Sequence, residues 1–429
     1  MLKGLIHFDR VKPFVRVGLA ALAAFAAGCV TSFVMLRTQN NESLSDQIRG
    51  SKLKLDTKKS HLLRNSVIAV AGAFVLTIAG LRIFSVVSYR NDRNEYAKAG
   101  YLNLVDGADN KINVYSTGVP NGKHTIVGLA GMGIEDYPVS TKALNERLGK
   151  ENTVIYADRP GYGFSDDSYK KQTLEEVVEN YRAGLKNASF EAPYVLMPHS
   201  YASFYALWWQ AKYPEEVEAI IFMDCTEVPK NEHWRTWTID DYPSEAAAYA
   251  DARKYRMRTW LGLDRLIDYK QESAEDLVDG SAILTQEQMH LHELTRRRAW
   301  TAANISEMMN EPKAAQELRE ILKPTDTPKL WFSSTPACEE DIRESIKYDK
   351  ADYEAAGLQY KQEPETTAKA IWQSSKWFHQ DYYENTLAPF LEQCGNCRLV
   401  CIGGYHHLFW AQKPDKVTAE IEQFLAEIQ

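Results

Sequence analysis

The 429-residue chain has few cysteines, no excess of positive charge and no zinc-ribbon pattern. Its net charge is −8, and both signs are interspersed through the C-terminal three quarters, which excludes a general nucleic-acid-binding surface. Six cysteines are too few for a disulfide scaffold, and they lack the second pair that a zinc ribbon needs. They are Cys29, Cys225, Cys338, Cys394, Cys397 and Cys401. We therefore expect no nucleic-acid partner and no bound metal.

The composition, 45% hydrophobic and 25% charged, is typical of a globular protein, and the length allows two or three domains. Cys394 and Cys397 are separated by two residues, a spacing that occurs in redox pairs and in small disulfide loops. No second motif supports redox chemistry. We predict thiols near the start of a strand, with the disulfide as the alternative.

Long apolar runs occur twice near the N-terminus. Val17 to Leu36 carry no charge, and a run of this length crosses a hydrocarbon core about 30 Å thick. In Ser66 to Ser88 the only charge is Arg82, near the far end, where a long side chain reaches the interface. A cleaved signal peptide would have a shorter apolar region. The sequence predicts a membrane hairpin at residues 1–95, with helices at about 14–36 and 66–88, that contacts membrane lipid through both.

The loop between the two runs carries seven basic residues, against four before the first run and three soon after the second. Because positive charge is retained on the cytoplasmic side, this loop is expected there. The sequence thus predicts a multi-pass protein whose C-terminal domain is extracytoplasmic.

From Tyr101 onward, strand patterns alternate with helical ones, which is typical of a mostly parallel sheet covered by helices on both faces. The expected strands are 102–105, 112–115, 125–129, 152–157, 194–197, 219–223, 329–334 and 398–402. Residues 226–325 are rich in helical pattern and aromatics, and we expect them to be a helical lid inserted into the sheet. The core is then divided into residues 96–225 and 326–429.

The stretch Pro198-His199-Ser200-Tyr201-Ala202 follows an apolar strand pattern and precedes a helical one. A serine on a sharp turn between strand and helix is the nucleophile elbow, whose strained backbone holds the hydroxyl free above the sheet. Ala202 supplies one of the two small residues that the turn needs. Pro198 stands where the usual pattern has glycine, so the match to G-x-S-x-G is partial.

Together with this stretch, three other segments in the same order resemble the lidded α/β-hydrolases of the serine type. Asp158-Arg159-Pro160-Gly161-Tyr162-Gly163-Phe164-Ser165 is close to the D-R-P-G-x-G-x-S turn, which is structural in that family. Ala130-Gly131-Met132-Gly133 stands where the family has H-G-x-G. Gly404-Tyr405-His406-His407, with Pro414 after it, resembles the histidine loop. The resemblance implies an α/β-hydrolase fold from Tyr101 to Gln429, no cofactor and an oxyanion hole made by the backbone N–H groups of Met132 and Tyr201.

A serine hydroxyl becomes nucleophilic when a base takes its proton. In the family a proline follows the catalytic histidine by seven residues, and this spacing selects His407, with His406 as the alternative. His199 is expected to support the turn by packing. Adjacent side chains on a tight turn diverge, so it is not expected to be the base.

The acid of the triad has two candidates in the sequence. The family's usual place corresponds to Ala337 and Cys338, neither of which can serve. Asp224 ends the preceding strand, where some lidded relatives carry the acid, and we take it as the first candidate. Glu340 is the second, although three consecutive acidic residues also suit the start of a helix.

Serine rather than aspartate at the elbow argues against dehalogenase and epoxide-hydrolase chemistry. The resemblance implies a membrane-anchored hydrolase that cleaves small-molecule or lipid carboxylic esters through an acyl-enzyme. An aminopeptidase or a cofactor-free peroxidase could use the same triad. A catalytically inactive binding module is the alternative that Pro198, Ala130 and the displaced acid leave open.

Overall fold

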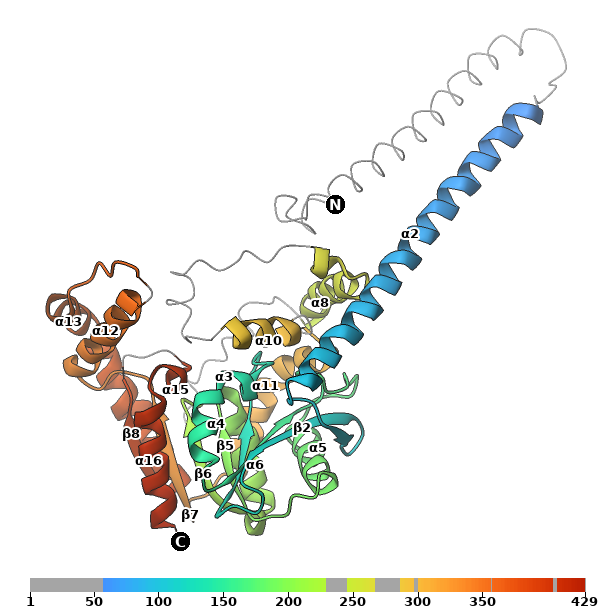
Figure 1. Ribbon diagram of the computed structural model, residues 1–429. Helices are drawn as coiled ribbons and strands as arrows, with labels where there is room; N and C mark the ends of the chain where they lie inside the picture. Colours follow the sequence, from blue (N-terminus) through green and yellow to red (C-terminus); the bar gives the residue numbers. More distant parts are fainter. Residues whose placement is uncertain are drawn as a thin grey trace. The chain divides into compact units, whose positions relative to one another are not determined.

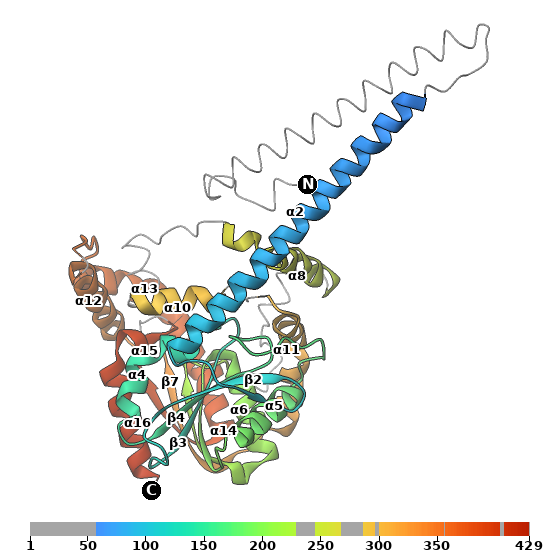
Figure 2. The same cartoon turned by 45° about the vertical axis from the view of Figure 1, so that its right-hand side comes forward.

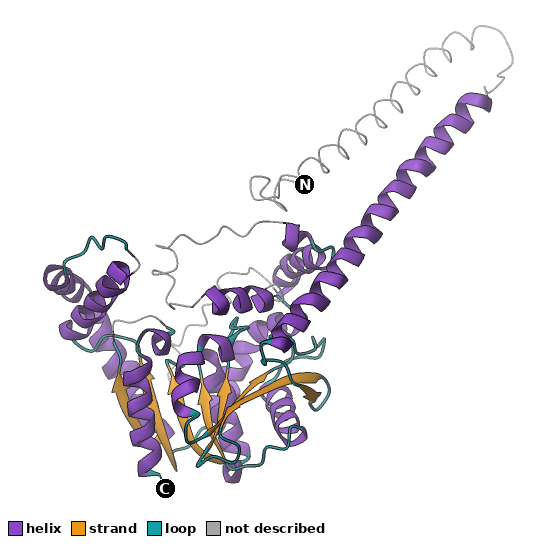
Figure 3. Ribbon diagram, in the orientation of Figure 1, coloured by secondary structure: helices purple, strands orange, loops and turns teal. Residues whose placement is uncertain are grey.

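The computed structural model describes residues 57–228, 245–266, 286–296, 300–355, 357–403 and 407–428. The chain divides into two compact units, one made of Met1–Asn91 with Arg256–Gln271 and the other of Asp92–Tyr255 with Glu272–Gln429. Figure 1 follows the chain by residue number, and Figure 3 distinguishes its helices from its strands.

In the first unit, α2 (Thr57–Lys98) is a helix of 42 residues. Its part Arg64–Lys98 is the one segment of the described chain that is long and apolar enough to cross a membrane. Many of its apolar side chains are exposed, among them Val67, Ile68, Phe74, Val75 and Leu76. The predicted helix 66–88 lies within α2 but was placed too short, because the charged flanks are good helix formers and continue the helix. The other predicted span, 14–36, lies outside the described residues, and the described residues contain one candidate membrane helix.

Arg82, the charge within this apolar helix, has a protein partner. Its Nη1 donates to the carbonyl of Trp260 at 3.2 Å, and its guanidinium carbon lies 5.1 Å from the centre of the Trp260 ring. Ser85 Oγ donates to the carbonyl of Thr259 at 2.9 Å. Arg82 thus contacts the end of α8 (Glu245–Trp260), within the same unit, and its position at the membrane interface stays a prediction.

The second unit contains a sheet of eight strands in the order β1-β2-β4-β3-β5-β6-β7-β8. The strands are β1 (Leu104–Asp106), β2 (Lys111–Gly118), β3 (Thr125–Leu129), β4 (Thr153–Asp158), β5 (Tyr194–Pro198), β6 (Val217–Met223), β7 (Thr325–Ser333) and β8 (Gly395–Cys401). Each corresponds to an expected strand. β2 pairs antiparallel with β1 and β4, and all other neighbours are parallel. This order, with a serine turn after β5, is that of the α/β-hydrolase fold.

Helices cover both faces of the sheet, as Figure 2 shows with the molecule turned. One face packs against α5 (Leu174–Asn187), α6 (Ser203–Lys212), α11 (Ala302–Ile321) and α14 (Ala388–Cys394). The other packs against α3 (Tyr137–Ser140), α4 (Lys142–Leu148), α15 (Phe409–Gln412) and α16 (Pro414–Glu427). Within β5, Leu196 faces the first layer, whereas Val195 and Met197 face the second. Because both faces are buried, the central residues of the parallel strands are mostly apolar.

Two insertions separate the last strands. Between β6 and β7, all described residues from 245 to 321 that belong to regular elements are helical: α8, η5 (Leu263–Leu266), α10 (Gln286–Arg296) and α11. Part of the predicted lid, 226–325, lies outside the described residues, and its role stays a prediction. Between β7 and β8 lie α12 (Glu339–Ala355), α13 (Pro364–Tyr382), the π-helical turn η6 (Tyr383–Leu387) and α14.

The parallel strands end at one edge of the sheet. Leu129 of β3 pairs with Pro198 of β5, and Met223 of β6 pairs with Phe332 of β7. The loops that follow these strands therefore meet at this carboxyl edge, where open α/β sheets bind their ligands.

Candidate active site

Ser200 lies on a strained turn between β5 and α6. It begins the short 3-10 helix η3 (Ser200–Ala202), and its φ is 52°. A non-glycine residue pays of order 1–3 kcal/mol to adopt the left-handed region, and such strain persists only where the surroundings impose it. The turn leaves Ser200 partly exposed while Ala202 is fully buried. The strand–turn–helix predicted around Ser200 is therefore present.

Pro198, the departure from the usual glycine, is the last residue of β5 and is buried. Its carbonyl accepts a hydrogen bond from Cys225 Sγ at 3.1 Å. The following residue continues toward β3, since His199 N–H donates to the carbonyl of Leu129 at 3.0 Å. The proline ring of Pro198 thus fits at the end of β5, and the hydrogen bond from His199 to β3 is kept.

The loop after β3 lies directly against the elbow. A Cβ added to Gly131 would be 2.9 Å from Ser200 Cβ and 2.8 Å from His199 Nδ1, so only glycine permits this approach. The carbonyls of Ala130 and Gly131 accept hydrogen bonds from Arg159 at 2.6 and 3.1 Å. Within the described part of the chain, the N–H groups of Met132 and Tyr201 are not engaged by other protein groups. Both are thus available beside Ser200.

His407 and Asp224 come together from loops that are far apart in the sequence. His407 Nδ1 lies 2.7 Å from Asp224 Oδ2. His407 follows β8, and half of its side chain is exposed, while the Asp224 side chain is 17% exposed. This contact leaves Nε2 of His407 as the nitrogen free to exchange a proton with another group.

Asp224 is held firmly. Its φ is 46°, so it shares with Ser200 the rare left-handed conformation. Besides His407, it accepts hydrogen bonds from the N–H of Ser334 at 2.8 Å and from Ser334 Oγ at 2.6 Å. Ser334 follows β7, and it binds the carboxylate that follows the neighbouring strand β6. Sequence reasoning missed Ser334, because no local pattern marks a donor to a residue 110 positions away.

The other candidates lie elsewhere. Glu340, near the start of α12, forms an ion pair with Arg343 rather than with His407. The N–H groups of Ala337 and Cys338 donate to Asp341 at 2.8 and 3.0 Å, so this acidic run serves the start of a helix. His406 lies outside the described residues.

His199 is fully buried between the rings of Tyr137, Trp410 and His407, with centroids 5.7, 4.7 and 4.4 Å away. Burial, and next the nearby His407, hold the pKa of His199 well below its usual value. It is therefore neutral, and it packs against His407 without adding a second charge. This agrees with the packing role expected from the sequence.

No hydrogen bond joins Ser200 Oγ to His407 Nε2 among the described residues, although the ring of His407 lies against the residue before Ser200. Catalytic hydrogen bonds are often long without substrate and tighten in the complex. The arrangement brings a strained serine, a histidine–carboxylate pair and free N–H groups to one edge of the sheet.

Glu227 adds a further carboxyl group close to Asp224, and sequence reasoning did not single it out. Desolvation raises the pKa of Glu227 to about 7, and the hydrogen bond from Tyr382 at the end of α13 opposes this rise. The group thus changes its protonation near neutral pH.

No cluster of three His, Cys, Asp or Glu side chains that could hold a metal ion occurs in the part of the chain that the structure describes. Cys394 and Cys397 are free thiols, the first ending α14 and the second within β8, as predicted. Burial raises the pKa of Cys397 to about 12. The pair is therefore protonated and unreactive at neutral pH.

No family model matches this chain. An uncharacterized protein of Bacillus subtilis, YbdG, is 26% identical over 295 residues, which are 68% of this chain and 87% of that protein. A membrane phospholipase A described as a bacterial virulence factor matches in structure with a TM-score of 0.49 and 13% identity, over 86% of this chain and 99% of that one. A meta-cleavage product hydrolase from Pseudomonas fluorescens matches with a TM-score of 0.48 and 13% identity, over 77% and 100%. At such values neither match bears on the activity of this chain.

Proposed function

We propose that this chain is a membrane-anchored serine hydrolase that cleaves carboxylic esters through an acyl-enzyme. The proposal is carried by one observation: the strained Ser200, the His407–Asp224 pair and the loop of Gly131 meet at the carboxyl edge of the sheet. Ser200 is the nucleophile, His407 the base and Asp224 the acid.

In the proposed reaction, His407 Nε2 takes the proton of Ser200 as the oxygen attacks the acyl carbonyl. Asp224 accepts the Nδ1–H hydrogen bond and stabilises the imidazolium that forms. The N–H groups of Met132 and Tyr201 donate to the oxyanion, which is the negatively charged former carbonyl oxygen of the tetrahedral intermediate. The proton then passes from His407 to the leaving alcohol, and a water activated in the same way releases the acid.

Apolar esters are the proposed substrates. The long apolar helix α2 would keep the chain at a bilayer, where lipidic esters are concentrated. The positive charges between the two apolar runs support a domain on the extracytoplasmic side. Protease added to intact cells tests this orientation. Digestion of the C-terminal domain only after lysis would contradict it.

The decisive experiment is labelling with a fluorophosphonate, which forms a bond to an activated serine. The wild-type chain in detergent or bilayer should be labelled, and Ser200→Ala and His407→Ala should not. Ser374→Ala, on the exposed face of α13, and His290→Ala, whose ring pairs with Glu95 on the surface, are matched controls that should be labelled normally. A folded wild-type chain that resists the probe would instead be a binding module.

Substrate class is separated by a panel. Nitrophenyl esters of increasing acyl length should be cleaved, whereas aminoacyl amides should not. Faster amide cleavage would indicate an aminopeptidase, and turnover that requires peroxide would indicate a peroxidase.

A further inference from the structure

A buried charged cluster lies behind the loop that follows β3. Arg159 is 1% exposed and Glu307 2%, and Arg159 Nε lies 2.8 Å from Glu307 Oε1. Tyr205 on α6 donates to Glu307 Oε1 at 2.5 Å, and Tyr162 donates to Oε2. Glu307 belongs to α11, the helix that ends the insertion between β6 and β7. The carboxylate is therefore compensated by one cation and two hydroxyl groups.

Arg159 stays charged in this environment. Burial lowers the pKa of Arg159, but the charge of Glu307 and the nearby hydroxyl groups of Tyr162, Tyr181 and Tyr205 together outweigh burial and leave the pKa above its usual value. Tyr162 lies under the guanidinium, with its ring centre 3.6 Å from the guanidinium carbon. The rigid, planar fork of arginine can thus bind in three directions at once.

The cluster holds the loop at three points. Arg159 Nη1 donates to the carbonyl of Ala130, and Nη2 donates to the carbonyl of Gly131. Gly133 N–H donates to the hydroxyl oxygen of Tyr162 at 3.2 Å. Both main-chain carbonyls and one N–H are fixed by side chains from a single turn, residues 158–165.

These contacts set the direction of the remaining N–H groups. In a trans peptide the C=O and the N–H point in opposite directions, and the one cis bond of the described chain is Ala192–Pro193. When the carbonyl of Gly131 points at Arg159, the N–H of Met132 therefore points away from it. The Cα of Gly131 adjoins Ser200, so this peptide group lies beside the serine.

We propose that Arg159, fixed by Glu307 of α11, is a positioning residue that aims the oxyanion-hole N–H of Met132. The inference rests on the proposed function and extends it. Arg159 does not touch the substrate; it prevents the peptide between Gly131 and Met132 from rotating its carbonyl toward Ser200. The turn predicted to be only structural thereby affects the rate of the reaction.

Further contacts dock α11 on the same turn, so the position of Glu307 depends on the insertion. Asp167 accepts from the N–H groups of Ala302 and Ala303 at 3.2 and 3.0 Å, at the start of α11. Gly161 leaves no room for a side chain, because a Cβ would be 2.3 Å from Thr301 Oγ1.

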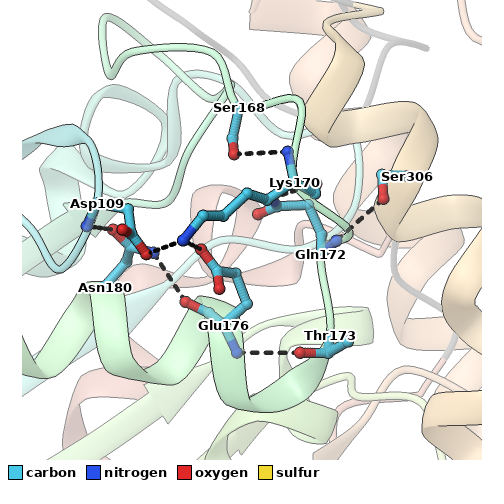
Figure 4. Close-up of polar contacts among 8 residues, drawn as sticks. All are labelled: Asp109, Ser168, Lys170, Gln172, Thr173, Glu176, Asn180 and Ser306. Carbon is cyan, nitrogen blue, oxygen red and sulfur yellow. Dashed lines mark hydrogen bonds and ion pairs between the residues drawn. The ribbon is translucent and has the colours of Figure 1, made fainter.

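The rest of the loop is tied down as Figure 4 shows. Gln172 N–H donates to Ser306 Oγ of α11 at 3.0 Å, and Lys170 lies between Asp109 and Glu176, 2.5 and 3.8 Å away. Thr173 accepts from the N–H of Glu176 at 3.1 Å and begins α5. The loop 166–173 thus leads into α5 and contacts α11 at Ser306, the residue before Glu307.

The test is Arg159→Lys in the full chain, with hydrolysis of a nitrophenyl ester as the readout. Lysine keeps the charge but cannot reach both carbonyls, so kcat should fall on the order of 10²-fold while KM stays within about twofold. The inhibition constant of a boronic acid, which forms a tetrahedral adduct with serine, should rise in proportion to the loss of kcat. Tyr162→Phe, which keeps every charge, should lower kcat about tenfold, so the test survives if Arg159→Lys fails to fold.

Arg182→Lys and Tyr213→Phe are matched controls. Arg182 and Tyr213 form an arginine–tyrosine contact of the same kind, 3.4 Å from guanidinium carbon to ring centre, at the other edge of the sheet. Both controls should leave kcat unchanged. A folded Arg159→Lys with normal kcat would overturn the inference, as would a rise in KM at constant kcat. Either result would show that Arg159 does not affect how well the Met132 N–H stabilises the transition state.

Hydrogen exchange separates this inference from the proposed function. The amides of residues 130–134 should exchange faster in Arg159→Lys than in wild type, whether or not the chain hydrolyses esters. Faster exchange in a chain that fluorophosphonate does not label would refute the proposed hydrolase activity but would support the role of Arg159 in fixing the loop. Unchanged exchange in an enzyme that hydrolyses esters would refute the role of Arg159 alone.

Discussion

Two clusters of arginine, glutamate and tyrosine occur at opposite edges of the same sheet. At the carboxyl edge, Arg159 and Glu307 are almost fully buried, and Arg159 also binds two main-chain carbonyls. At the amino edge, Arg182 pairs with Glu216 at 2.6 Å and with Glu179 at 2.9 Å, and these side chains are 21–35% exposed. Tyr213 donates to Glu179 at 2.6 Å, which completes a similar set of contacts.

The difference lies in what the arginine binds and in the solvent around it. Arg182 contacts side chains that can rearrange, and water screens its charge, so an exposed pair of this kind contributes about 0–1 kcal/mol. Water does not reach the buried guanidinium of Arg159, so removal of its partner leaves a buried charge without compensation. Burial turns the same residue types from a surface ion pair into a device that fixes the main chain.

The largest expected effect tests whether two carboxylates, Asp224 and Glu340, also differ in importance according to what they bind. Asp224→Asn should lower kcat on the order of 10⁴-fold, because the amide favours the wrong tautomer of His407, while the fold is kept. Glu340→Gln should leave kcat within about twofold, because Glu340 pairs with Arg343 on an exposed helix. Steady-state ester hydrolysis measures both, and equal losses would contradict the assignment of the acid.

The next effect is on stability. Glu307→Gln should lower the free energy of unfolding by about 3–5 kcal/mol, because Arg159 is left buried without a counter-charge. Glu216→Gln, the matched change in the partly exposed cluster, should lower it by about 0–1 kcal/mol. Denaturant titration followed by tryptophan fluorescence checks both variants. Similar losses would show that burial does not distinguish the two clusters.

A smaller effect concerns Glu227. Burial raises its pKa in the folded chain to about 7 from the ordinary value of 4.5, so near neutral pH the folded state retains a proton that the unfolded state has released. Stability should therefore be complete below pH about 4.5 and decline by on the order of 1–3 kcal/mol as pH rises to about 7. The measurement is the unfolding midpoint against pH in wild type and in Glu227→Gln.

Glu227→Gln should remove this part of the slope, because the amide does not titrate. Glu216, whose pKa is lowered despite its partial burial, mainly through the hydrogen bond from Arg182, should contribute the opposite slope at lower pH. A profile that is the same with and without the Glu227 carboxyl would show that this group ionises normally.

The sequence alone predicted the eight strands, because apolar runs bounded by turn residues mark buried strands locally. It also singled out Ser200, Met132 and His407 as candidates, since each lies in a short motif whose spacing follows from one loop or one turn. The length of α2 was underestimated, because its charged ends continue the helix without any change in apolar pattern.

Tertiary structure decided what depends on distant partners. Asp224 and Glu340 were both open from the sequence. In the fold, β7 lies between β6 and β8, and this order brings Ser334 and His407 to Asp224, which supports Asp224 as the proposed acid. Glu307 has no local signal: a glutamate within a helix is ordinary until folding buries it against Arg159, more than a hundred residues earlier. Motifs specify local backbone geometry, whereas the burial of a charge and the identity of its partner arise only when the layers pack.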